Sequence, residues 1–174
     1  MKPLDHAELK DRFYLALGRL VHAYSSLDFN VGIALGWLGP HNGVDVRDLL
    51  IGRVPLADRL EALKPLVLKM YRAAGNDALA EFEAWFAKVC KLKAIRNDYV
   101  HARWGLPGEL DSDDPILKML PMNWDFSADR LDKSVDVPLS ELESQSSRIG
   151  QLVDDFAMLR AKFAAYAVPA HWKK

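Results

Sequence analysis

The fold class is decided by residues 5–38, which read DHAELKDRFYLALGRLVHAYSSLDFNVGIALGWL. Apolar side chains recur in this stretch at spacings of three and four, which is the period of one face of a helix. Asp5 stands at its start with Glu8 three residues later, the pattern of a helix N-cap. Gly39 and Pro40 follow it and are typical of a helix end. The stretch therefore predicts one long amphipathic helix.

Three later segments carry the same helical period and predict three further helices. Pro55 suits the first turn of the earliest one, in which Pro65 is expected to produce a kink or a break. Gly105 and Pro107 are expected to end the next one. The three helices are expected over residues 55–74, 76–104 and 139–166, with a short helical turn at 46–51 before them.

Residues 106–137 differ in composition from the helical segments around them. Prolines and an acidic cluster at 111–114 accompany two extended-looking pieces, 116–124 and 131–137, which predict an irregular excursion or a β-hairpin. The cluster lacks the glycine and glutamate that an EF-hand loop needs, so we expect a solvated loop rather than a calcium site. Four long helices with short connections predict an all-α fold. We expect an antiparallel four-helix bundle that occupies residues 1–174 as one domain.

Composition and charge favour a globular cytoplasmic protein. Hydrophobic residues make up 50% of the 174 residues and charged residues 27%, which argues against disorder. The net charge of −1 provides no global positive field, so any contact with nucleic acid must be local. Cys90 is the sole cysteine, and its apolar helical surroundings predict a buried, inert thiol in a reducing compartment. The polar N-terminus does not resemble a signal peptide, and the longest apolar run, residues 31–38, is too short to span a membrane.

Several chemistries lack their sequence patterns. The chain has no glycine-rich phosphate loop, no dinucleotide fingerprint and no Gly-x-Ser-x-Gly elbow. Its five histidines form no pair at a spacing of four, and the Glu-x-x-His pairs of a carboxylate di-iron bundle are absent from the predicted helices. We therefore expect no metal site and no cofactor.

Residues 94–104, which read AIRNDYVHARW, bring together the side chains best suited to chemistry. Histidine suits acid or base duty near neutral pH, and arginine binds phosphate oxygens through a fork of N–H groups. At about 100° per residue, Asn97 and His101 share one helix face, while Arg96 lies roughly 140° round from His101. Either the long arginine bends toward the histidine, or a second copy of the helix completes the site across a two-fold axis.

Arg96, Asn97 and His101 resemble the motif of the HEPN superfamily, an arginine followed by a polar residue and, four to six residues on, a histidine near a helix end. The resemblance covers most of the chain apart from 106–137. The resemblance implies an endoribonuclease that needs no metal and acts on RNA as a homodimer. It also implies a role in a bacterial defence or toxin–antitoxin system, with a cognate antitoxin or another protein as a further partner. His101 would be the general acid or base, Arg96 the phosphate clamp, and Asn97 would orient His101 or the phosphate. Arg103 stands where some relatives carry a tyrosine that their antitoxin modifies, so such regulation is not expected.

Residues beside the motif are candidates for substrate binding. Lys93 and Arg103 could contact an RNA backbone, and Trp104 could stack on a base or instead line the core or the dimer interface. Asp28 interrupts the apolar stretch of the first helix. It could orient Arg96 or His101, or it could lie on the solvent face.

A competing interpretation assigns the motif a structural role. Arginine, asparagine and histidine at a helix end can cap carbonyl groups and pair with an acid such as Asp98. The chain would then be a non-catalytic helical interaction module, or a sensor that binds a small molecule or nucleotide inside the bundle.

Overall fold

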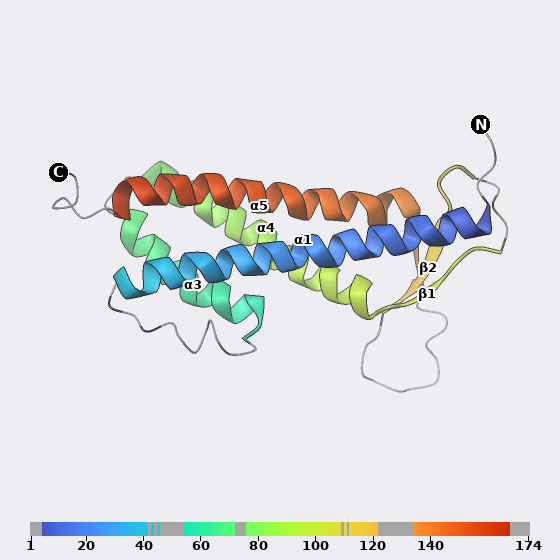
Figure 1. Cartoon of the computed structure of the whole chain (residues 1–174), viewed down its shortest axis with the longest axis horizontal. Coiled ribbons are helices and arrows are strands. Elements are labelled where there is room, and N and C mark those ends of the chain that lie inside the picture. The colour runs from blue at the N-terminus through green and yellow to red at the C-terminus, as the bar shows by residue number, and fades with distance from the viewer. Residues whose placement is uncertain are drawn as a thin grey trace. The chain divides into compact units, whose positions relative to one another are not determined.

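The structure is a computed structural model that describes residues 5–41, 43, 45, 54–71, 76–108, 110, 112–121 and 134–167. This part of the chain is mostly helical, with a small three-stranded antiparallel sheet (Figure 1). Its elements are, in order, α1 (His6–His41), α3 (Leu56–Tyr71), α4 (Asn76–His101), β1 (Arg103–Gly105), β2 (Ile116–Leu120), β3 (Val135–Pro138) and α5 (Leu139–Ala167).

The long first helix is confirmed, together with its predicted cap. Asp5 Oδ1 accepts a hydrogen bond from the Glu8 backbone N–H at 2.8 Å, which satisfies one of the free donors of the first turn. The helix continues to His41, so Pro40 lies inside its last turn rather than beyond it. A proline so close to a C-terminus removes a single helical hydrogen bond, which the helix tolerates.

The second helix also runs through its proline. Helix α3 spans Leu56–Tyr71 with Pro65 inside it, so of the two predicted effects of this proline the break does not occur. Pro55 directly precedes it, and the Pro55 carbonyl accepts the N–H groups of Asp58 and Arg59 at 3.0 and 3.2 Å. The turn predicted at 46–51 lies outside the described residues.

The predicted hairpin is confirmed in its paired part, and it gains a third strand. Strands β2 and β3 pair antiparallel, and β1 pairs antiparallel with the other edge of β2. Helix α4 therefore ends at His101, and Arg103 and Trp104 belong to β1 instead of the helix. A strand of three residues is too short for its alternating apolar pattern to be recognised next to a long helical pattern. Strand β1 is identified only by its pairing with β2.

The chain divides into two compact units, and each contains parts of α1, α4 and α5. The first unit comprises Met1–Tyr24 with Leu92–Ile149, and the second comprises Ser25–Lys91 with Gly150–Lys174. The buried core of the first unit includes Leu9, Phe13, Ala16, Leu20, Leu92, Tyr99, Leu117, Met119, Val137, Leu139, Leu142 and Ile149. The buried core of the second includes Leu27, Val31, Ala34, Leu35, Leu38, Leu56, Leu60, Leu63, Leu66, Val67, Phe82, Trp85, Val89, Leu152, Phe156 and Leu159.

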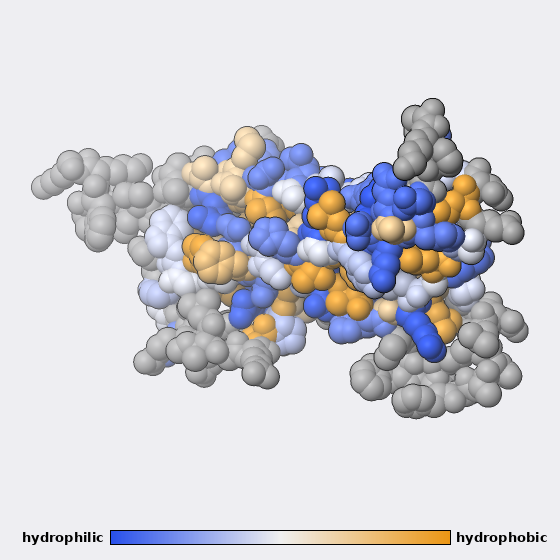
Figure 2. All heavy atoms as spheres, turned by 45° about the vertical axis from the view of Figure 1, so that its right-hand side comes forward, coloured by the Kyte–Doolittle hydropathy of each residue, from blue (hydrophilic) through white to orange (hydrophobic). Residues whose placement is uncertain are grey.

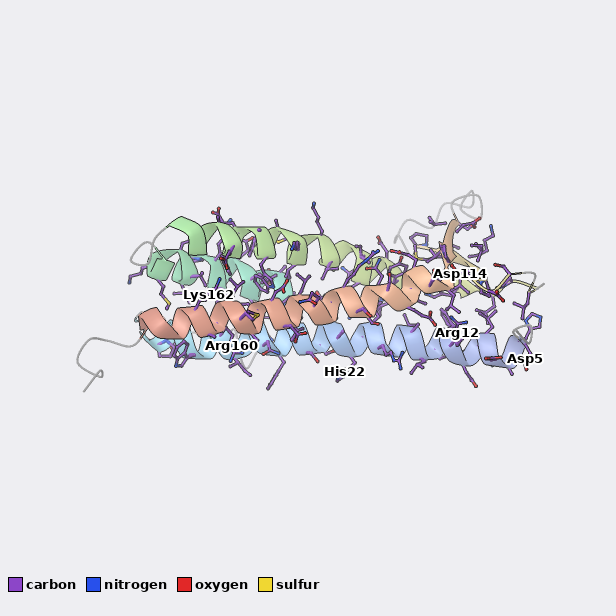
Figure 3. All side chains as sticks on the ribbon, turned by 90° about the horizontal axis from the view of Figure 1, so that it is seen from above. Asp5, Arg12, His22, Asp114, Arg160 and Lys162 are labelled. Atoms are coloured by element: carbon purple, nitrogen blue, oxygen red, sulfur yellow. The ribbon has the colours of Figure 1, made fainter. Side chains whose placement is uncertain are left out.

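The acidic loop before β2 caps a helix. Asp114 accepts hydrogen bonds from the Ser140 backbone N–H at 2.9 Å and from the Ser140 hydroxyl at 2.6 Å. Asp114 therefore lies beside the N-terminal end of α5, as Figure 3 shows. A carboxylate at this position satisfies a free donor and complements the positive end of the helix dipole. The loop is thus tied to α5 through Asp114 instead of being solvated throughout.

The Cys90 side chain, which was predicted to be buried, is exposed. Cys90 follows the buried Val89 by one residue, and this step of about 100° turns it away from the core face of α4. His22 lies on the outer side of α1, as Figure 3 shows, and is likewise exposed. An exposed thiol is accessible to oxidants and alkylating reagents, unlike the inert thiol that the sequence predicts.

Helix α1 also carries apolar side chains outside its buried stripe. On the face drawn in Figure 2, hydrophobic residues lie in separate patches between hydrophilic ones. Such scattered exposure is ordinary for a protein surface. The exposed large side chains of α1 are Tyr14, Leu15, Val21, Phe29, Ile33 and Trp37.

Candidate functional site

The three motif residues meet at the C-terminal end of α4, within the first unit. Arg96 Nη1 donates a hydrogen bond to Asn97 Oδ1 at 2.9 Å and lies 3.3 Å from His101 Nε2. Arg96 is half-buried, whereas Asn97 and His101 are exposed. The arginine therefore bends toward the histidine within one chain, which is the first of the two routes that the helix geometry allowed.

The contact between Arg96 and His101 places a donor beside an imidazole nitrogen. A guanidinium has only donors, so an Arg96 N–H can bond to His101 Nε2 only when that nitrogen carries a lone pair. An exposed imidazole beside a permanent cation can exchange a proton with a substrate that the cation binds.

An aromatic ring from α1 supports the guanidinium. Arg96 Cζ lies 5.1 Å from the centre of the Tyr24 ring, which is a cation–π contact. Arg96 Nε is buried and has no hydrogen-bond partner among the described residues, so this side of the group rests on packing. The sequence predicts Tyr24 only as part of an apolar stripe. Its role next to Arg96 depends on the packing of α1 against α4, which neither segment reveals alone.

Trp104 fixes the end of α4. Its indole Nε1–H donates to the Tyr99 carbonyl at 2.9 Å and so satisfies one of the last carbonyls of the helix. Its ring stacks on that of Tyr99 at 5.6 Å and packs against Phe13 at 5.5 Å. Of the alternatives for Trp104, this geometry favours the core and not a platform for a base.

Tyr99 lies beside a polar network on α5 in which Gln145 is buried. Burial raises the pKa of the Tyr99 hydroxyl above its ordinary value, and the charge of Glu141 raises it further. Gln145 is 2% exposed and donates to Glu141 Oε1 at 2.5 Å, while Arg148 Nη1 donates to the same oxygen at 2.9 Å. A tyrosine hydroxyl is protonated at neutral pH at its ordinary pKa, and the upward shift keeps Tyr99 further from ionisation, so it does not serve as a base. Its part is to anchor the helix end that carries Arg96 and His101.

The remaining predicted site residues are Arg103, Lys93 and Asp28. Arg103 is exposed on β1, two residues after His101, while the side chain of Lys93 lies outside the described residues. Asp28 belongs to the second unit, where its carboxylate accepts a hydrogen bond from Arg59 Nη1 at 3.2 Å. Its orienting role toward the motif stays a prediction. In the described part of the chain, the exposed Asp98 forms no ion pair with Arg96, whose Nη1 contacts Asn97 and His101 instead.

Comparisons with protein-family models, with curated proteins and with solved structures found no match for this chain. Among the described residues, no three histidine, cysteine, aspartate or glutamate side chains are grouped as a metal site would require. No helix in the described ranges combines the length and the apolar character needed to cross a bilayer.

Proposed function

We propose that this chain is a HEPN-like, metal-independent endoribonuclease built as an antiparallel four-helix bundle. The observation that carries the proposal is the position of Arg96 Nη1, within hydrogen-bond range of both Asn97 Oδ1 and His101 Nε2. It places a permanent cation beside an exposed imidazole at a helix end. An RNA phosphate needs both, because a proton must leave the 2′-hydroxyl while charge develops on the phosphate oxygens.

The chemistry follows from these roles. When Arg96 turns to the phosphate, His101 Nε2 is released from its contact with the guanidinium and takes the proton of the 2′-hydroxyl, and the 2′-oxygen attacks the adjacent phosphorus. The bond from phosphorus to the 5′-oxygen breaks, and that oxygen leaves as a hydroxyl with a proton from water, while His101 returns the proton it took to water. The products are a 2′,3′-cyclic phosphate and a 5′-hydroxyl end. Arg96 binds the phosphate oxygens as their charge grows. Asn97 holds the guanidinium through its side-chain oxygen.

The proposal extends to the biological setting. A homodimer would place two copies of the exposed motif together, and the proposed role is in bacterial defence or in a toxin–antitoxin pair with a protein antitoxin as partner. Arg103 occupies the place of the modified tyrosine of some relatives, so control through that modification is not proposed.

The second candidate is a non-catalytic interaction module. The observation that favours it is the packing of Arg96 on Tyr24, because a guanidinium held on an aromatic ring can serve stability alone. The two candidates differ in the role of His101. In the first its exposed imidazole transfers a proton, and in the second it has no chemical role.

The experiment that tests the proposal is cleavage of a mixed RNA pool in EDTA, with the product ends identified. We expect wild type to leave 2′,3′-cyclic phosphates and His101→Ala to leave the RNA intact. A folded wild type that cleaves nothing would support the interaction module. Equal cleavage by the variant would indicate another site or a contaminant.

Tyr24 offers a test of how Arg96 is held. Tyr24→Leu is expected to lower the rate of single-turnover cleavage roughly 2- to 30-fold, because a cation–π contact is worth about 0.5–2 kcal/mol. Tyr24→Phe keeps the ring and should retain most of the rate. If both variants lose the same activity, the phenolic hydroxyl matters instead of the ring face.

A further inference from the structure

The β1–β2 sheet presents a distinct outer face next to the motif. Arg103 pairs with Leu120 across the two strands, and Gly105 pairs with Lys118. Cross-strand partners in an antiparallel pair point to the same side, so these four residues share one face. Trp104 and Met119 point to the opposite side, where Met119 is buried. The four residues Arg103, Gly105, Lys118 and Leu120 define what we call the outer β1–β2 face.

This face contains a hollow of about 300 Å³. Its lining residues are Arg103, Trp104, Gly105, Lys118, Leu120 and Ser134. The volume is at the small end of the range for ligand sites, which fits a fragment the size of one nucleotide better than a folded partner. Gly105 leaves space in the hollow because it has no side chain. A Cβ at this position would lie 3.5 Å from the Lys118 side chain and fill part of the space.

The outer β1–β2 face carries two cations above an apolar floor. Arg103 is exposed, and the described residues provide it with no ion-pair partner. Lys118 pairs with Asp136, but both side chains are 58% exposed, so this salt bridge contributes little and a phosphate can replace it. The two cations lie diagonally across the strand pair, about 7–8 Å apart at their Cβ atoms. Leu120 provides apolar area beside them.

The chain itself sets the distance from this face to the motif. Arg103 follows His101 by two residues, so their Cα atoms are at most about 7 Å apart. A stacked nucleic-acid strand advances about 3.4 Å for each nucleotide. A strand whose phosphate contacts Arg96 and His101 therefore reaches the hollow within two or three nucleotides.

We propose that the outer β1–β2 face binds the stretch of single-stranded RNA that flanks the scissile phosphate. Arg103 and Lys118 bind its phosphates, and a base lies over Gly105 and Leu120 in the hollow. Single-stranded RNA is the fitting occupant because its unstacked bases can turn into a small apolar hollow while its phosphates meet nearby cations. The inference rests on the proposed nuclease function, and it adds the path of the substrate away from the cleaved bond.

The test is binding of a fluorescent 12-nucleotide single-stranded RNA to the full chain in the His101→Ala background, measured by anisotropy at several salt concentrations. Each of Arg103→Ala and Lys118→Ala is expected to weaken binding about 3- to 10-fold at low salt. Each should also reduce the slope of log affinity against log salt by about 0.7, as loss of one phosphate contact does. Gly105→Val fills the hollow without changing charge, and it should weaken binding with the salt slope unchanged. Lys91→Ala removes an exposed lysine from α4 in the other unit and is the matched control.

The outcomes separate this inference from the function on which it rests. Binding by Arg103→Ala and Lys118→Ala equal to that of Lys91→Ala would overturn the inference, and cleavage that still depends on His101 would then leave the nuclease standing. Binding that depends on both cations, in a protein that cleaves no RNA, would support the RNA-binding face and reject the nuclease. Wild type that binds no RNA would overturn both. Circular dichroism of every variant confirms that a lost signal is not lost folding.

Discussion

Trp85→Ala is expected to lower the free energy of unfolding by about 3–5 kcal/mol, the range for removing a large aromatic side chain from a core. Trp85 is 3% exposed within the second unit, and its ring stacks on that of Phe156 at 4.4 Å with 13° between the ring planes. Its Nε1–H donates to the Leu152 carbonyl at 2.9 Å in the same buried region. The substitution removes the stack and the hydrogen bond together and leaves a cavity. Urea unfolding followed by circular dichroism measures the change.

Two further substitutions test the cause of that loss. Trp85→Phe keeps an aromatic ring against Phe156 but loses the hydrogen bond, so it should cost about 1–2 kcal/mol. Phe29→Ala removes an aromatic side chain that is 67% exposed on α1, and it should change stability by less than about 0.5 kcal/mol. A loss below 1 kcal/mol for Trp85→Ala would contradict the packing described for this unit.

The helices could be predicted from sequence because burial repeats with the helical period. The apolar stripe of α1 is confirmed at Leu9, Leu20 and Leu27, among others, and its N-cap is confirmed at Asp5. In α4, the helical period alone does not distinguish Phe86 from its neighbour Trp85, which is the more deeply buried of the two. Adjacent aromatic residues both suit an apolar stripe, and the choice between them depends on Phe156 in a distant segment.

Features that depend on tertiary pairing could not be predicted. Strand β1 has three residues and exists because β2 lies beside it. Asp114 belongs to a loop of acidic residues whose composition suggests only solvation, yet it caps α5 through Ser140. Such contacts join segments that are far apart in sequence, and a local pattern holds no information about them.

The contacts of the candidate site differ in the same way, because some arise within one helix and others join separate segments. The contact of Arg96 with Asn97 and His101 arises within one helix end, so helical geometry and the length of arginine were enough to offer it as one of two alternatives, the other being a site completed by a second copy of the helix. The Tyr24 ring beneath Arg96 comes from another helix and escaped prediction. Asp28 was considered as an orienting acid, and the ion pair it forms is with Arg59.

The largest functional effects are expected at Arg96 and His101. Each alanine substitution should reduce the rate of single-turnover RNA cleavage about 10²- to 10⁴-fold, the range for losing a general base or a group that stabilises transition-state charge. Arg96→Lys should recover little of that loss, because an ammonium cannot both reach His101 Nε2 and present a planar fork to a phosphate. Asn97→Ala should cost less than about tenfold, since Asn97 bonds to Arg96 and has no other proposed role.

The double variant distinguishes catalysis from structure most sharply. If Arg96 and His101 act on one phosphate as a unit, Arg96→Ala combined with His101→Ala should be about as slow as the slower single variant, because effects within a catalytic unit do not multiply. Two residues that act independently would give the product of the two losses. A motif with a purely structural role would give a third result. Arg96→Ala would then lower the urea midpoint by uncovering Tyr24, and no variant would change an RNA cleavage rate, because wild type would show none.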